Sequence, residues 1–125
     1  MTEPIVFISS SRIVEADEET FTRALGTAAD RIEAMKPRTA LFGAYVDAAR
    51  REVRIVHAFA DASAMTAHFE GSHDRTRAAA SLLTPVRFEV YGDAPRASLA
   101  LLAEEAAGAG GALTTWRGVA GYLRA

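Results

Sequence analysis

The chain has 125 residues, of which 50% are hydrophobic and 24% are charged, and its formal net charge is −2 at pH 7. This length suits one domain that can bury a core, and the composition excludes a chain that is disordered throughout. The weak net charge argues against a nucleic acid or an anionic membrane as partner. The absence of cysteine excludes disulfides, thiol nucleophiles and thiolate metal sites.

The N-terminal residues show no targeting pattern. Met1-Thr2-Glu3-Pro4 has no basic residue, and the apolar stretch Ile5–Ile8 is far shorter than the hydrophobic region of a signal peptide. No apolar run approaches the roughly 18 residues of a membrane-spanning helix. We therefore expect a cytoplasmic protein that does not associate with a membrane.

The first half of the chain predicts a strand, a helix and two more strands. Residues 5–13 begin with β-branched and aromatic side chains, which are typical of a strand. Asp17 predicts a helix start, because its carboxylate can accept hydrogen bonds from the free amides of the first turn, and Lys36-Pro37 predicts the end of that helix. Ala40–Val46 and Glu52–Phe59 read as strands with a short polar connection. The helix carries one apolar stripe, formed by Phe21, Leu25, Ala28, Ile32 and Met35.

The next elements complete a recognisable order. Asp61 predicts the start of a second helix, Arg75–Leu83 reads as a further helical piece, and Val86–Tyr91 reads as a fourth strand. The order β-α-β-β-α-β predicts an α+β fold, the ferredoxin-like sandwich, with both helices on one side of a four-stranded antiparallel sheet. After this unit, residues 1–92, we expect an extension of the same domain over residues 93–125, with a helix that starts at Pro95 and a short strand at Ala112–Trp116.

The second face of the sheet is expected to be covered by another copy of the chain. Both faces of the second predicted strand are partly apolar, because Phe42, Ala44 and Val46 alternate with Leu41, Gly43 and Tyr45. A sheet with helices on one side only should alternate between apolar and polar residues. A symmetric homodimer that pairs sheet against sheet would cover this face and enclose a cavity; the alternative is a semi-polar surface. The extension, with its apolar leucines and Trp116, is expected to pack against the partner or over the mouth of that cavity.

Three histidines are the first candidates for catalysis, because imidazole titrates near neutral pH. His68 and His73 are five residues apart, which is not the i, i+4 spacing of two metal ligands on a helix, so we expect no metal site. His57 shares a strand face with Ile55 and Phe59 and is expected to be buried. Each histidine is a candidate base for a phenolic substrate; the alternative is a structural role, with backbone carbonyls as partners.

A polar set on the fourth strand is a candidate for substrate binding. Arg87, Glu89 and Tyr91 share the face opposite Val86, Phe88 and Val90. Arg87 and Tyr91, with Tyr45 and Phe42 of the second strand, are candidates for orienting a small aromatic ligand. The alternative for the charged residues is ion pairing across strands or across a dimer.

Two segments resemble a known family. In Val53–His73 a strand ends in the aromatic Phe59, and a capping acid and an alanine-rich helix with His68 follow, then a small residue and His73. This segment, with Thr84–Gly92 as a last strand, resembles the dimeric α+β barrel superfamily, in particular the antibiotic-biosynthesis-monooxygenase-like (ABM) domains. The resemblance covers about Pro4 to Gly92, and Pro95–Arg124 looks like an extension found in some actinobacterial-type members.

The resemblance implies a ferredoxin-like protomer in a two-fold dimer whose sheets close into a barrel. Some members of the family oxidise polycyclic aromatic or quinol-type substrates with dioxygen and no cofactor, and others degrade haem. Here the single tryptophan, Trp116, lies in the extension, and Phe69 stands on the second helix, which argues against haem. We expect a cofactor-independent monooxygenase that acts on a small aromatic or quinol-type substrate in a dimer barrel cavity. The alternative is a non-catalytic dimeric ligand-binding or stress-associated module.

Overall fold

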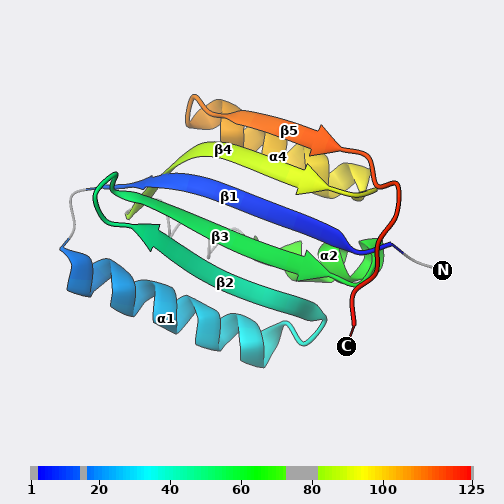
Figure 1. The fold of residues 1–125 in the computed structure, drawn as a ribbon, viewed down its shortest axis with the longest axis horizontal. Helices are drawn as coiled ribbons and strands as arrows, with labels where there is room; N and C mark the ends of the chain where they lie inside the picture. The colour runs from blue at the N-terminus through cyan, green and yellow to red at the C-terminus, as the bar shows by residue number, and fades with distance from the viewer. Residues whose placement is uncertain (1–2, 15–16, 73–81, 125) are drawn as a thin grey trace.

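The computed structural model describes residues 3–14, 17–72 and 82–124. It shows one five-stranded sheet in the order β2-β3-β1-β4-β5. Helices α2 and α4 lie behind this sheet in Figure 1, and α1 runs along its β2 edge. The described elements are β1 (Ile5–Ile13), α1 (Glu18–Met35), β2 (Thr39–Asp47), β3 (Glu52–Phe59), α2 (Ala62–Phe69), β4 (Leu83–Tyr91), α4 (Arg96–Gly108) and β5 (Ala112–Trp116).

The sheet confirms the predicted α+β ferredoxin-like fold and adds a strand to it. β1 pairs antiparallel with β3 and with β4, and β2 pairs antiparallel with β3. β5 then pairs parallel with β4, because α4 carries the chain back across the sheet before β5 begins. The sheet is therefore mixed, with four antiparallel strands and one parallel edge strand.

Capping side chains fix where the first two helices begin. The Asp17 carboxylate accepts a hydrogen bond from the Thr20 amide at 2.7 Å. Hydrogen bonding to the Thr20 side chain first, and to this amide second, lowers the pKa of Asp17. The Asp61 carboxylate accepts one from the Ala64 amide at 2.8 Å. Lys36, which ends α1, donates from Nζ to the carbonyls of Ala67 and Glu70 at 2.9 and 2.8 Å, so it ties the end of α1 to the end of α2.

The core lies on the helix-covered face of the sheet. One group of buried residues packs between the sheet, α2 and α4, and it includes Phe7, Phe59, Met65 and Leu102. A smaller group, centred on Phe21 and Val53, packs near the start of α1. The members of these two groups are Ile5, Phe7, Phe59, Ala64, Met65, Phe88, Val90, Leu102 and Ala106 in the first, and Ile13, Phe21, Val53 and Leu83 in the second.

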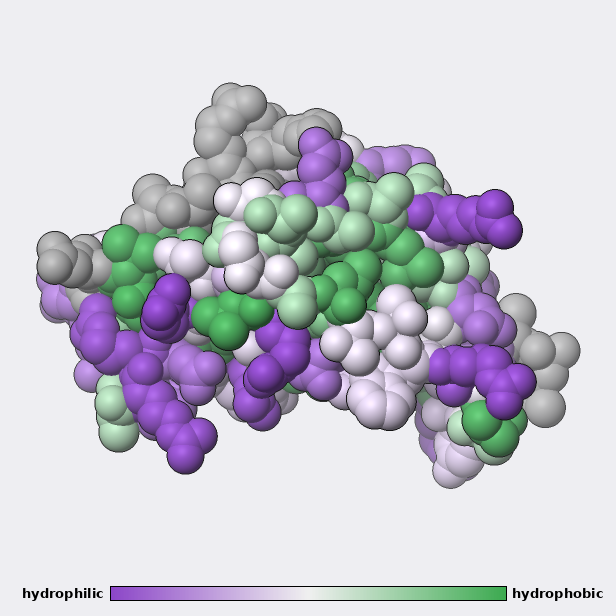
Figure 2. Space-filling model, turned by 90° about the horizontal axis from the view of Figure 1, so that it is seen from above, coloured by the Kyte–Doolittle hydropathy of each residue, from purple (hydrophilic) through white to green (hydrophobic). Residues whose placement is uncertain are grey.

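The extension differs from the expectation in part. α4 packs on its own protomer, with Leu102 and Ala106 buried in the core, because these two residues lie one turn apart on the helix face that meets the sheet. Trp116 and Leu123 remain 53% and 40% exposed. Seen from the α4 and β5 edge, apolar side chains form a band across the middle of the molecule, and hydrophilic side chains surround this band (Figure 2).

Two further expectations concern the segment before β4. Leu83, expected to end a helical piece, is instead the first residue of β4, where it pairs with Ile13 of β1. The rest of that piece, residues 75–81, and His73 lie outside the described residues. No helix in the described part of the chain is long and apolar enough to span a membrane.

Candidate active-site cavity

A cavity of about 390 Å³ lies between the helix-covered face of the sheet and the helices. Phe7, Phe42 and Phe88 line it from the strands. Leu25 and Ala28 line it from α1, and Leu102 lines it from α4. The walls are therefore mainly apolar, and aromatic rings form much of the sheet side. This composition is typical of pockets that bind small organic molecules.

Two buried histidines meet in the wall of this cavity. His57 comes from β3 and His68 from α2. The two residues are 7% and 4% exposed, and their ring centroids are 4.9 Å apart. Phe7 stacks on His57 with centroids 4.9 Å apart and planes at 15°, and Phe42 meets His57 edge-on at 5.1 Å. These aromatic contacts hold the His57 ring in one orientation.

Hydrogen bonds indicate which nitrogen of His57 carries the proton. His57 Nδ1 lies 3.3 Å from the carbonyl oxygen of Phe7. A carbonyl can only accept, so Nδ1 is the donor, and in the neutral ring the lone pair is at Nε2. His68 Nδ1 lies 2.8 Å from Thr39 Oγ1, and either atom can donate because a hydroxyl is both donor and acceptor.

A few other polar side chains line the cavity. Ser9 and Ser11 come from β1, Ser72 follows α2, and Glu105 comes from α4. Sequence reasoning did not single out Ser9, Ser11 or Glu105 as cavity residues. Alternation along β1 places both serines on the face of Phe7, and Glu105 lies three residues after Leu102 on α4, so periodicity is the signal that could have found them.

The other predicted substrate-binding residues lie on the open face of the sheet. Tyr91 Oη donates to Glu89 Oε2 at 2.7 Å, and Arg87 Nε lies 3.6 Å from Glu89 Oε1. The hydrogen bond to Glu89, with desolvation next, raises the pKa of Tyr91. Tyr45 lies across Gly43, where an added Cβ would be 2.8 Å from Tyr45 Oη. A side chain at position 43 would therefore displace this ring.

The predicted site residues thus fall into separate groups. His57, His68 and Phe42 line the cavity together. Arg87 and Tyr91 alternate with the core residues Phe88 and Val90, and so point away from the cavity. Tyr45 pairs with Arg54 on that same open face, so the sheet separates it from the cavity. Within the described residues, no three His, Cys, Asp or Glu side chains come together as metal ligands do.

Comparisons with known proteins establish the fold. MupZ from Pseudomonas fluorescens matches 98% of this chain and 96% of its own at 17% identity and a TM-score of 0.71. A Caulobacter crescentus protein, whose name assigns it provisionally to the antibiotic biosynthesis monooxygenases, matches over 71% of this chain and 88% of its own, at 16% identity and a TM-score of 0.59. The fold is that of the ABM domains.

A third structure is that of a point mutant of SnoaB, a cofactor-independent oxygenase from Streptomyces nogalater. It matches 76% of this chain and 95% of its own at 11% identity and a TM-score of 0.59. No protein-family model matches the sequence, and no curated protein matches it. The match to MupZ covers 98% of the chain, whereas the other two matches cover 71% and 76% of it.

Proposed function

We propose that this protein is a cofactor-independent monooxygenase that binds a small aromatic or quinol-type substrate in the cavity beside His57. The observation that carries the proposal is the pair of buried histidines in the wall of an aromatic-lined cavity of about 390 Å³. That volume lies within the roughly 300–1,000 Å³ of small-molecule pockets. The monooxygenase-like fold supports the proposal. The substrate site is accordingly assigned to the helix-covered face of one protomer, and not to a barrel between two sheets.

In the proposed reaction the substrate supplies its own electrons. His57 Nε2 takes a proton from an acidic C–H or O–H of the substrate, and the resulting carbanion or enolate reduces dioxygen. For a benzylic methylene the balance is R₂CH₂ + O₂ → R₂C=O + H₂O, so one oxygen atom enters the substrate and the other leaves as water with both hydrogens. His57 returns its proton to that water. The apolar walls exclude solvent from the anion.

His68 is proposed to stabilise the substrate anion. Its ring lies 4.9 Å from that of His57, and Thr39 Oγ1 holds Nδ1 at 2.8 Å. If Nδ1 accepts from the threonine hydroxyl, the proton of the neutral ring is at Nε2, and Nε2 can donate to an oxyanion of the substrate. The two imidazoles then have opposite tasks, one as base and the other as donor.

Oxygen uptake tests the proposal. Anthrones, naphthols and hydroquinones are offered to the purified protein under dioxygen. The wild type is expected to consume oxygen with at least one of them, and His57→Asn is expected to lower kcat by about 100-fold or more. Glu104→Gln, an exposed change on α4, serves as the matched control. No uptake with any substrate, or full activity in His57→Asn, contradicts the proposal and favours a ligand-binding module.

We also propose that a second copy of the chain covers the open face of the sheet. Leu41 and Tyr45 on this face, and Trp116 at its β5 end, are 43%, 60% and 53% exposed. Charged residues lie in two neighbouring rows that run across the strands of this face. In the first row, Ser10 pairs with Arg54 on one side and with Arg87 on the other. The next row holds Asp47, Glu52 and Arg12. A two-fold arrangement lets the basic row of one copy meet the acidic residues of the other.

Sedimentation tests this assembly. The wild type is expected to sediment as a dimer at micromolar concentration, and Arg54→Glu is expected to weaken the dimer because like charges then meet across the two-fold axis. Glu104→Gln is again the control. A folded monomer at micromolar concentration contradicts the dimer and leaves the enzymatic proposal standing, because the cavity lies within one protomer.

A further inference from the structure

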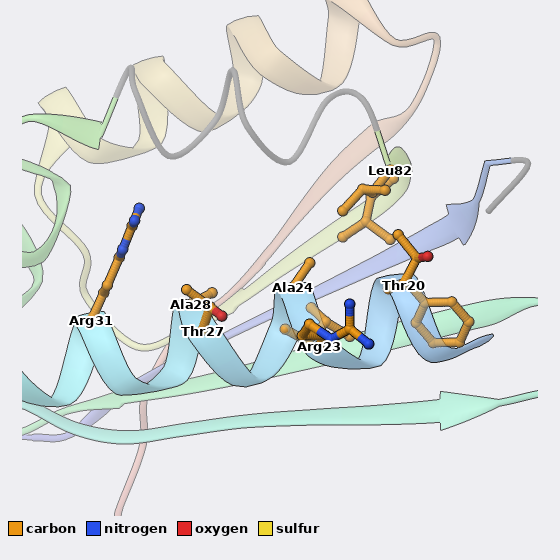
Figure 3. A pocket seen from close by; sticks show the side chains of 10 residues that line it. Thr20, Arg23, Ala24, Thr27, Ala28, Arg31 and Leu82 are labelled. Atoms are coloured by element: carbon orange, nitrogen blue, oxygen red, sulfur yellow. The ribbon is translucent and has the colours of Figure 1, made fainter. Parts of the chain in front are cut away.

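A second cavity adjoins the first one along α1. It measures about 420 Å³, and Leu25, Ala28 and Leu83 line both cavities. Ala24 and Ala28 lie on the side of α1 that faces Leu82, and all three residues line this second cavity (Figure 3). The two cavities are therefore adjacent, and Leu25, Ala28 and Leu83 are the residues that a ligand occupying both would pass.

Two arginines, Arg23 and Arg31, are among the residues that line the second cavity. The Arg23 guanidinium is engaged by Glu19, with Nη2 2.6 Å from Oε1. Arg31, in contrast, is exposed and makes no hydrogen bond or ion pair with any described residue. It follows Ala28 by three residues, about 4.5 Å along the helix axis, and both residues line the second cavity.

We propose that the ligand of this protein is an elongated amphiphile with an anionic end. Its ring lies beside His57, its apolar body passes Leu25, Ala28 and Leu83, and its anionic group, a carboxylate or a phosphate, binds the guanidinium of Arg31. Arginine suits this task because its planar fork donates two parallel hydrogen bonds to such an oxyanion. The inference rests on the proposed function only for the position of the ring.

A matched pair of probes tests whether a negative charge on the ligand strengthens binding through Arg31. 6-Phenylhexanoate has a ring, an apolar chain and a carboxylate, and 6-phenylhexan-1-ol differs from it only in lacking the charge. In NMR titrations the wild type is expected to bind the acid about twofold to fivefold more tightly than the alcohol, the range for one exposed ion pair. Arg31→Gln is expected to abolish this preference. Arg96→Gln, at an exposed position on α4, is expected to retain it.

A second pair of variants tests whether the apolar body of the ligand passes Ala28. Ala28→Leu adds a larger side chain where the two cavities adjoin, and it is expected to weaken binding of the acid and of the alcohol alike. Ala29→Leu changes a residue that lines neither cavity, and it is expected to leave both affinities unchanged. Phenylacetate carries its carboxylate one carbon from the ring, and it is expected to show no dependence on Arg31 because its charge stays beside the ring. 6-Phenylhexyl phosphate compares the two anions, and its binding is also expected to weaken in Arg31→Gln.

The results separate this inference from the proposed reaction. Equal affinities of the wild type for acid and alcohol, or an unchanged preference in Arg31→Gln, overturn the inference even where oxygen uptake is found. A preference that depends on Arg31 supports it even where no substrate is oxidised, because every readout is binding.

Discussion

The two faces of the sheet are built from the same strands and have opposite properties. On β3, Val53, His57 and Phe59 are buried under the helices, while Arg54, next to them in the chain, is exposed on the open face. Alternation along a strand places neighbouring residues on opposite faces, so one sequence serves two environments. The candidate catalytic residues His57 and His68 lie on the covered face, and the charged residues of β3 lie on the open face.

The covered face concentrates polar groups into a few fixed contacts. Nδ1 of His57 faces the carbonyl oxygen of Phe7, and Nδ1 of His68 faces Thr39 Oγ1. Aromatic rings pack around both imidazoles. On the open face the polar contacts are more exposed, as in the ion pair of Arg87 with Glu89, whose side chains are 43% and 23% exposed. Solvent screens such pairs, and each contributes little to stability. A reaction that needs water excluded therefore belongs on the covered face.

The largest expected difference between the faces is in stability. Phe59 is fully buried, and Phe59→Ala is expected to lower the free energy of unfolding by about 3–5 kcal/mol, because it leaves a cavity in the core. Tyr45→Ala, on the open face, is expected to change it by about 0.5 kcal/mol or less. Urea unfolding measures both, at the lowest usable protein concentration so that association does not contribute. Losses of equal size would mean that the open face is packed as tightly as the core.

A smaller effect is expected from the residue that begins α2 and thereby positions His68. Asp61→Ala removes the acceptor for the Ala64 amide and is expected to cost about 1 kcal/mol of unfolding free energy. Asp61→Asn keeps a capping oxygen and loses only the ion pair with Arg38, 3.2 Å away, so it is expected to lose much less. Urea unfolding distinguishes the two variants. Equal losses would assign the stability to the ion pair instead of the cap.

The smallest expected effect is the titration of Tyr91. Its hydrogen bond to Glu89 raises the pKa above the usual 10.0, so the folded protein keeps the phenol proton that the unfolded chain loses. The stabilisation is complete below pH 10 and declines as the pH rises through the folded pKa. Glu89→Ala is expected to lower the Tyr91 pKa. Absorbance titration of the phenolate measures this as a difference between variant and wild type, and identical curves would show that the hydrogen bond is not formed.

Much of the fold was predictable because each element carries a local signal. The strand Glu52–Phe59 and the strand Ala112–Trp116 were predicted with the bounds that the structure shows, and Asp17 and Asp61 begin their helices as capping residues do. Leu83 was assigned to a helical piece, Arg75–Leu83, that was expected to stop before Pro85. Its pairing with Ile13 is a long-range contact, which local patterns do not report.

The candidate site was predictable only in part, for the same reason. Alternation correctly grouped His57 with Ile55 and Phe59, and Arg87 with Tyr91. Which of these groups faces a cavity depends on where the helices pack, and α4, at the far end of the chain, supplies one wall. Tyr45 and Phe42 were taken together as candidate contacts, although their odd spacing places them on opposite faces of β2.

The central claim is that ligands bind on the covered face. Its most direct test is an NMR titration with 2-naphthol that follows the imidazole signals of His57 and His68 together with the ring signals of Tyr45 and Tyr91. We expect saturable shifts of both imidazoles while the two tyrosines stay unchanged. Shifts of Tyr45 and Tyr91 with unmoved imidazoles would contradict the account and place the ligand on the open face.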